Sequence, residues 1–208
     1  MKFRIIGDNN IIIKHFENNA IIYIAIMLIF LIGILVGVIH YNKIENKKEI
    51  STYVKESITK IIDKDEYNSH LNSKDKLLDS IKISFLIWVL GSSIIGVPVL
   101  LFYVSYRGFS LSFTISSLIS TYGIIKGNLI GFTMLFIPYL LSIFAIFIPI
   151  VSGIRLAIDT ITKSKEIKIE LIKHGFLSIF CSIFLIASFA IEMAINKTFL
   201  AYILAKIQ

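Results

Sequence analysis

The side chains of this sequence that could do chemistry are its histidines, its cysteine and its carboxylates. The four histidines lie in separate segments without the spacing of metal ligands: His15, His40, His70 and His174. The chain has no phosphate-binding glycine loop and no GxSxG or HExxH motif. Its acids cluster only between residues 43 and 82, where a solvated surface explains them. We therefore expect no catalysis, no cofactor and no bound metal.

Two charged residues at the ends of apolar runs are the remaining candidates for chemistry. A carboxylate within a membrane segment is a functional candidate by default. Glu192, however, ends an apolar run and has Lys197 nearby, which favours a solvated or paired structural acid. Arg155 either extends to the membrane interface or forms a pair with Asp159. Cys181 lies inside an apolar run and, as the only cysteine, has no partner for an internal disulfide.

Composition indicates the environment in which these residues lie. The 208-residue chain is 56% hydrophobic and 17% charged, and its mean hydropathy is +0.81. Soluble domains carry about 25% charged residues, so these values predict a polytopic helical membrane protein. The net charge of +7 then reflects lysines and arginines beside anionic lipid. We therefore expect the positively charged side chains to interact with the lipid bilayer and not with nucleic acid.

Uncharged runs long enough to cross a bilayer predict about five transmembrane helices in an all-α fold. We expect residues 1–208 to form a single membrane domain. The expected spans are about 20–40, 83–106, 108–125, 129–154 and 174–194, with an extracytoplasmic loop at 43–82. Pro98 predicts a kink near Ile94 in the second span. Pro138 and Pro149 interrupt the fourth, which is either a kinked helix or two pieces around a re-entrant break.

Small residues on the predicted spans indicate where helices approach each other closely. The expected packing residues are Gly33, Gly37, Gly91, Gly96, Pro98, Ser112, Ser116, Ser120 and Gly123. Gly127 and Gly131 continue the stripe of the third span at the same four-residue step. A polar cavity lined by this stripe is the alternative. Arg107 and Gly108, between the second and third spans, are expected to form a tight polar turn.

The polar segment 43–82 is expected to carry an amphipathic helix, because apolar residues recur there at helical spacing. The candidates for docking a partner on this stripe are Tyr53, Val54, Ile58 and Ile61. Packing of the stripe against the protein's own helices is the alternative. Ser73 is suited to cap a further helix, which begins at Lys74 and leads into the second span.

The placement of positive charge predicts the orientation. With the amino terminus inside, the tail, the Arg107 turn and the loop from Arg155 to Lys173 carry nine lysines and arginines. Three lie outside when the long loop is left aside. The nine lysines of the long loop work against the rule, although its eight acids nearly balance them. We expect the amino terminus inside, and the loop 43–82 and the carboxyl terminus outside.

A distinctive pattern, W-x-L-G-x-S-x-I-G-x-P-V, lies in the second predicted span. Its members are Trp88, Leu90, Gly91, Ser93, Ile95, Gly96, Pro98 and Val99. The basic-glycine pair Arg107-Gly108 follows, and then a hydroxyl-bearing span with Phe113 and Thr114. Together with the chain length, the five-span layout and the long loop, this pattern resembles the stage II sporulation protein M family of endospore-forming bacteria. The chain departs from the family pattern where Tyr139 follows a proline in the fourth span.

The resemblance implies a non-catalytic membrane scaffold that anchors or localises peptidoglycan-remodelling enzymes during forespore engulfment in sporulation. Its implied partners are the stage II sporulation proteins D and P. Its implied location is the cell membrane, as a multi-pass protein of the septal or engulfing membrane. The alternative is a permease-like transport subunit that acts with an ATPase or as a homo-oligomer.

Overall fold

The computed structural model describes residues 16–62, 73–133, 137–162 and 167–195, and every regular element in them is a helix. The elements are α2 (Ala20–Lys43), α3 (Lys47–Ile62), α5 (Ser73–Gly91), α6 (Gly96–Tyr122), α7 (Ile124–Gly131), α8 (Ile137–Ile161) and α9 (Ile167–Ile195). The all-α prediction is confirmed. The predicted helix that leads into the second span is also present, since α5 begins at Ser73 and continues to Gly91.

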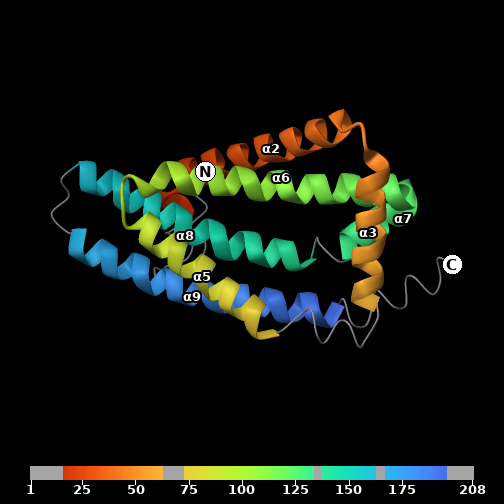
Figure 1. Ribbon diagram of the computed structural model, residues 1–208. Coiled ribbons are helices and arrows are strands. Elements are labelled where there is room, and N and C mark those ends of the chain that lie inside the picture. Colours follow the sequence, from red (N-terminus) through yellow and green to blue (C-terminus); the bar gives the residue numbers. More distant parts are fainter. Residues whose placement is uncertain (1–15, 63–72, 134–136, 163–166, 196–208) are drawn as a thin grey trace, which may run out of the picture.

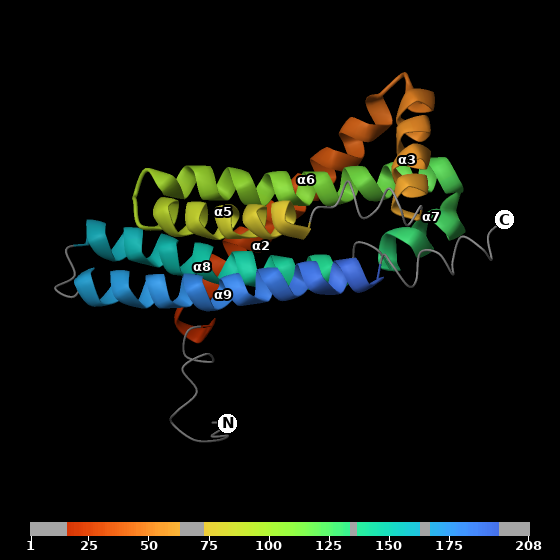
Figure 2. The ribbon, with the colours of Figure 1, turned by 60° about the horizontal axis from the view of Figure 1, so that its bottom comes forward.

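The long helices form a bundle, and the short helices lie at one end of it. α2, α6 and α9 run toward the end at which α3 and α7 lie, and α5 and α8 run away from that end (Figure 1). α2 packs along α6, α8 packs along α9, and α5 contacts α6, α8 and α9. Figure 2 shows α2 inclined to the other long helices. Consecutive long helices are therefore antiparallel, as in a multi-pass membrane protein.

Three of the helices are long and apolar enough to cross a membrane: Ala20–Lys43, Pro138–Ile161 and Lys168–Glu192. The outward apolar side chains of α2 are not covered by other helices: Ile21 is 83% exposed and Leu35 is 62% exposed. Exposed large apolar side chains on this scale are expected where lipid, and not water, surrounds a helix. These three helices indicate a multi-pass membrane protein.

The hydrophobic core lies where α2, α6 and α8 meet. Ile26, Leu100 and Ile150, one from each of these helices, are completely buried. Phe30 of α2 meets Phe147 of α8 edge to face, with 5.7 Å between the ring centroids. Packing against α2 and α8 therefore fixes the position of α6, which carries the polar residues described below.

The predicted second span consists of two helices, because the chain reverses at residues 92–95 between α5 and α6. A Cβ atom on Gly96 would overlap the carbonyl oxygen of Leu90, so glycine lets α6 start directly against the end of α5. Pro98 lies in the first turn of α6, where backbone amides have no intrahelical acceptor. It starts a helix and does not interrupt one, so the predicted kink near Ile94 is wrong.

The predicted turn at Arg107 and Gly108 is also wrong, since both residues lie inside α6. A Cβ atom on Gly108 would overlap the carbonyl oxygen of Phe30, so this glycine serves the approach of α2 and not a chain reversal. α6 is thus one helix that contains both the end of the predicted span 83–106 and nearly all of the predicted span 108–125.

The GxxxG pair of α2 lies on the same seam between α2 and α6. A Cβ atom on Gly33 would overlap the carbonyl oxygen of Ser105, and one on Gly37 would overlap Oγ of Ser112. The backbones of α2 and α6 are therefore in direct contact along this seam. This close approach increases van der Waals contact, which drives helix association in lipid because the hydrophobic effect does not.

The hydroxyl stripe of α6 faces three different surroundings along its length. Ser112 is buried and donates to the carbonyl of Phe109 at 3.1 Å, Ser116 is half-buried, and Ser120 is exposed. Gly123, with a φ of 83°, ends α6, and a Cβ atom there would have no atom within 4 Å. The packing stripe predicted from Ser112 to Gly123 therefore does not reach Ser120, and Gly123 is a turn residue.

The run predicted as the fourth span contains the end of α7 and most of α8, and the segment between its two prolines is one helix, because α8 runs from Ile137 through Pro149 to Ile161. α7 folds back on the end of α6, because a Cβ atom on Gly127 would lie only 2.5 Å from Cα of Ile119. α8 begins separately at Ile137, with Pro149 in its interior. Pro149 removes the hydrogen bond that would reach the carbonyl of Ala145, a buried residue.

Candidate functional site

Arg107 is half-buried near the middle of α6, where uncharged residues precede it from Ile83 to Tyr106 and follow it to Ile125. α6 continues through this position from Gly96 to Tyr122, and Gly108 packs against α2. A cation in an apolar helix is costly unless other groups solvate it, which makes it a functional candidate.

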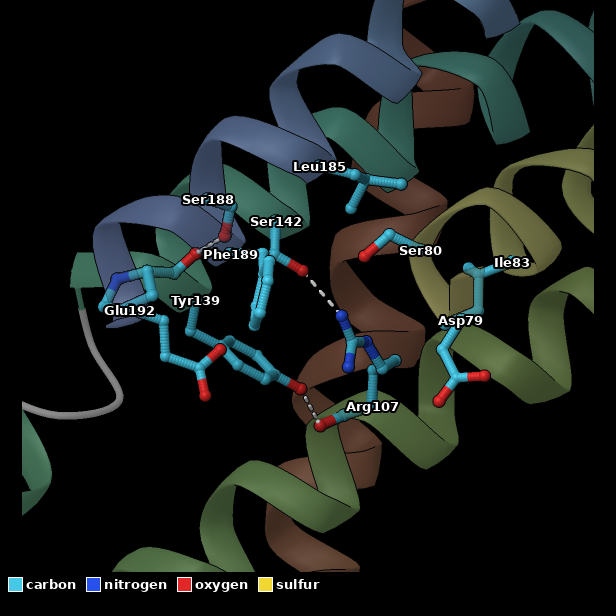
Figure 3. Close-up of a pocket in the computed structure, with 11 residues that line it drawn as sticks. Asp79, Ser80, Ile83, Arg107, Tyr139, Ser142, Leu185, Ser188, Phe189 and Glu192 are labelled. Carbon is cyan, nitrogen blue, oxygen red and sulfur yellow. Dashed lines mark hydrogen bonds between the residues drawn. The ribbon is translucent and has the colours of Figure 1, made fainter. Parts of the chain in front are cut away.

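Side chains from two helices hold the guanidinium group. Its Nη2 donates to Oγ of Ser142 on α8 at 2.6 Å. Its carbon lies 5.1 Å from the ring centroid of Tyr139 and 5.9 Å from that of Tyr103, within the range of cation–π attraction. The hydroxyl of Tyr139 also donates to the backbone carbonyl of Arg107 (Figure 3). Tyr139, the departure from the family pattern noted in the sequence, thus helps to position this arginine.

The charge of Arg107 is nevertheless left without an anion in the part of the chain that the structure describes. No carboxylate among those residues lies within ion-pair distance of it. Its Nε is buried and has no hydrogen-bond acceptor. A neutral hydroxyl and two aromatic rings solvate the cation without neutralising it.

Arg107 lines a pocket of about 340 Å³ that is formed by side chains of α5, α6, α8 and α9 (Figure 3). The apolar part of its wall includes Ile83, Leu185 and Phe189. Leu185 and Phe189 are both buried, so this wall belongs to the packed interior of the bundle. Polar groups gather on the remaining wall, mostly hydroxyls and carboxylates.

Two carboxylates line the same pocket. Asp79 of α5 pairs with Lys82 at 3.2 Å, and both side chains are largely exposed. Glu192 is half-buried on α9. One turn before it, Ser188 donates to the carbonyl of Pro138 at 2.6 Å and so ties this part of α9 to the start of α8. The sequence predicts that Glu192 is solvated or paired. The acid lines the pocket and has an interaction partner, and Lys197 lies outside the described residues.

The sequence interpretation missed this pocket because it assigned Arg107 to a turn. The available signal was the length of uncharged sequence on both sides of a single arginine. Such a residue is a candidate for an intramembrane site before it is a candidate for a loop. The other polar members come from helices far apart in the sequence, and no motif links Asp79, Ser142 and Glu192.

α3 carries the predicted docking residues, and they lie on different sides of the helix. Ile58 is 5% exposed and Val54 is half-buried, on the side of α3 that packs against α6. Ile58 is therefore not available to a partner, as the alternative interpretation expected. Tyr53 is 71% exposed. The Ile61 side chain lies outside the described part.

The remaining candidates from the sequence serve helix packing. Gly91 lies against α8 and α9, since its Cβ atom would be 2.7 Å from Nε2 of His174. His174 is completely buried, and its Nε2 lies 3.4 Å from the carbonyl oxygen of Trp88. Arg155 pairs with Asp159 at 3.2 Å, but the arginine side chain is exposed, so the pair does not point into the bundle. Across the described residues, no group of three histidine, cysteine or acidic side chains is placed to hold a metal.

Comparison with known proteins agrees with the resemblance carried by the second predicted span. The family model described as Stage II sporulation protein M matches residues 26–195. Searches of curated proteins and of solved structures found no match. The matched region extends from within α2 to the end of α9 and includes every residue that lines the pocket. The chain therefore belongs to the stage II sporulation protein M family, which is generally non-catalytic and implies a membrane protein of sporulation.

Proposed function

We propose that this protein is a membrane scaffold that anchors peptidoglycan-remodelling enzymes, the stage II sporulation proteins D and P, during engulfment of the forespore. Family membership supports a sporulation role in the membrane. The observation that favours a scaffold is the position of α3, which crosses one end of the bundle and presents a polar face away from it (Figure 1).

α3 is suited to docking because one of its faces is fixed while the other is free. Ile58 is buried on the side that contacts α6, so the helix cannot rotate without exposing this side chain. The opposite face is exposed at Thr52, Glu56 and Thr59, and Tyr53 lies at its edge. Tyrosine is one of the residue types that are enriched at protein interfaces and among their binding hot spots.

The proposed topology has five membrane crossings, made by α2, α5, α6, α8 and α9, with the amino terminus inside. The turn between α5 and α6 and the ends of α8 and α9 that face each other lie at the end of the bundle opposite α3 (Figure 1). The segment from Arg155 to Lys173, which joins α8 and α9, carries five lysines and arginines, and this favours a cytoplasmic position for that end. α3 then lies outside, where the cell wall is.

The scaffold proposal predicts that Tyr53→Asp abolishes recovery of the peptidoglycan-remodelling enzymes. The added charge and the lost aromatic surface act on an exposed side chain, so the fold should be retained. Tagged full-length protein is purified from sporulating cells, and bound proteins are identified by mass spectrometry. Thr59→Asp is the matched control, since it adds the same charge on the exposed face of α3 without removing an aromatic ring. Equal recovery of the enzymes with Tyr53→Asp and with the unchanged protein would contradict the proposal.

The permease-like alternative receives less support. It placed a path along the hydroxyls of the third span, but Ser112 and Ser117 are buried in α6. The hydroxyls of Ser112, Thr114, Ser117 and Thr121 donate to carbonyls of their own helix. Hydroxyls satisfied in this way are a common means of accommodating polar residues in a membrane helix.

A further inference from the structure

The short helix α7 is apolar on the face that packs and also on the opposite face. Its packed face consists of three buried residues: Gly127, Ile130 and Gly131. Ile125 and Leu129 share the opposite face at helical spacing, and Phe132 continues this face at the end of the helix. All three side chains are exposed, Ile125 to 85%. An outward face of this kind is characteristic of a helix that meets lipid or another protein, and not water.

The contacts of α6 place α7 at the level where the apolar run of α2 ends. α2 has the highest hydropathy of the three candidate membrane spans, and its charge-free run ends at Lys43. Tyr41 of α2 meets Phe113 of α6 edge to face, with 5.5 Å between the ring centroids. Two residues further along α6, Cγ1 of Ile115 lies 3.6 Å from the position of a Cβ atom on Gly131. α7 therefore lies at the boundary between the hydrocarbon core and the headgroups.

The direction of α7 and its polar neighbours also suit this boundary. α7 runs obliquely across the end of the bundle, from the end of α6 toward the start of α8 (Figure 2). Helices that lie in the membrane interface have this orientation, with their apolar side chains below the headgroups. Tyr122 ends α6, and Lys126 is exposed on the flank of α7 between its packed and outward faces. Tyrosine and lysine are the residue types that place a polar tip among headgroups and an apolar body below them.

We propose that α7 is an interfacial helix that inserts Ile125, Leu129 and Phe132 into the membrane leaflet at the α3 end of the bundle. The partner of this face is the acyl-chain region of phospholipids directly below their headgroups. α3 packs on α6 at the same end of the bundle (Figure 1), so the insertion also holds α3 close to the membrane surface. The depth of α7 depends neither on the scaffold role nor on the number of crossings, because the end of α2 sets the boundary.

The first test measures the surroundings of position 125 in full-length protein reconstituted into phosphatidylcholine vesicles. Ile125→Cys is labelled with bimane, and the unchanged protein controls for reaction at the buried Cys181. The side chain of Ile125 is exposed, so its replacement should leave the fold intact. The vesicles contain phosphatidylcholine brominated either just below the headgroup or near the end of the acyl chain. We expect the bromines below the headgroup to quench the label more strongly than those at the chain end.

Two control positions calibrate the quenching. Leu35→Cys lies on the exposed face of α2, about two turns before its end, so bromines at the chain end should quench it more strongly. Thr59→Cys lies on the exposed polar face of α3 and should be quenched by iodide in water but not by brominated lipid. If Ile125→Cys behaves like Thr59→Cys, α7 faces water and the proposal is wrong.

Leu129→Cys, one turn further along the same face, provides an independent second reading. A helix lying in the leaflet requires the same order of quenching at this position as at Ile125→Cys, and water exposure at Leu129→Cys would overturn the proposal. Cover by protein gives a different result, because neither brominated lipid nor iodide would then reach the label. This result at both positions would assign the face to a second copy of the chain and would overturn the proposal.

Discussion

The residues that organise the seam between α2 and α6 act through the absence of a side chain. Gly33, Gly37 and Gly108 each lie where a Cβ atom would overlap an atom of the opposite helix. Two backbones at this distance make many weak dispersion contacts, which become important when lipid surrounds both helices. The seam in turn holds α6 in position, and with it Arg107.

Gly33→Ala should destabilise the protein, because the new methyl group would overlap the backbone carbonyl of Ser105, which cannot move independently of α6. Overpacking of this kind costs about 1–3 kcal/mol, more than the roughly 0.5–1 kcal/mol that alanine gains over glycine within a helix. Thermal unfolding in detergent, followed by circular dichroism, measures the difference.

Gly131→Ala is the control for this substitution. A Cβ atom there would lie 3.6 Å from Cγ1 of Ile115, which is an ordinary van der Waals contact. We expect its unfolding temperature to stay close to that of the unchanged protein. If both variants unfold at the same temperature, the close seam between α2 and α6 is incorrect.

At the scale of elements, the turn between α5 and α6 depends on Gly96 and not on Pro98. Gly96→Ala should lower the unfolding temperature, because its Cβ atom would overlap the carbonyl oxygen of Leu90. Pro98→Ala should change stability little, since a proline in the first turn of a helix removes no intrahelical hydrogen bond. The two variants are compared in the same unfolding assay. A larger loss for Pro98→Ala would restore the single kinked span that the sequence suggested.

The elements that the sequence predicts well are those with a strong apolar or periodic signal. The apolar run of α2 and the amphipathic stripe of α3 were both located from residue type and spacing. The turn after Gly91 was missed because residues 92–95, Ser-Ser-Ile-Ile, contain no charge, proline or glycine. Within a membrane a helix can end without a polar signal when neighbouring helices satisfy its backbone.

The candidate site could be predicted only in part, for a related reason. A lone arginine between two uncharged runs is visible in the sequence, and so is an acid at the end of the last apolar run. Their meeting depends on how α5, α6, α8 and α9 pack, and on Ser142 and Tyr139 reaching Arg107 across the bundle. Hydropathy describes the preference of each helix for lipid but carries no information on which faces of two helices meet.

At the scale of the whole molecule, the direction of each helix constrains how the bundle can lie in a membrane. α5 and α6 are antiparallel neighbours within the bundle (Figures 1 and 2). If they cross the bilayer with α2, α8 and α9, their turn lies on the opposite side of the membrane from α3. If only the three most apolar helices cross, that turn lies on the same side as α3, which would contradict the packing of α5 and α6 along the rest of the bundle. The positions of Tyr53 and Ser93 therefore distinguish five crossings from three.

Cysteine labelling can read out these two positions, because Cys181 is the only cysteine of the chain and is buried. Tyr53 and Ser93 are both exposed, so Tyr53→Cys and Ser93→Cys should be reactive without disturbing the fold. With a membrane-impermeant maleimide, we expect intact cells to label Tyr53→Cys, and Ser93→Cys to react only after permeabilisation. The unchanged protein controls for reaction at Cys181. Labelling of both variants in intact cells would favour three crossings, and labelling of Ser93→Cys alone would reverse the proposed orientation and place α3 away from the cell wall.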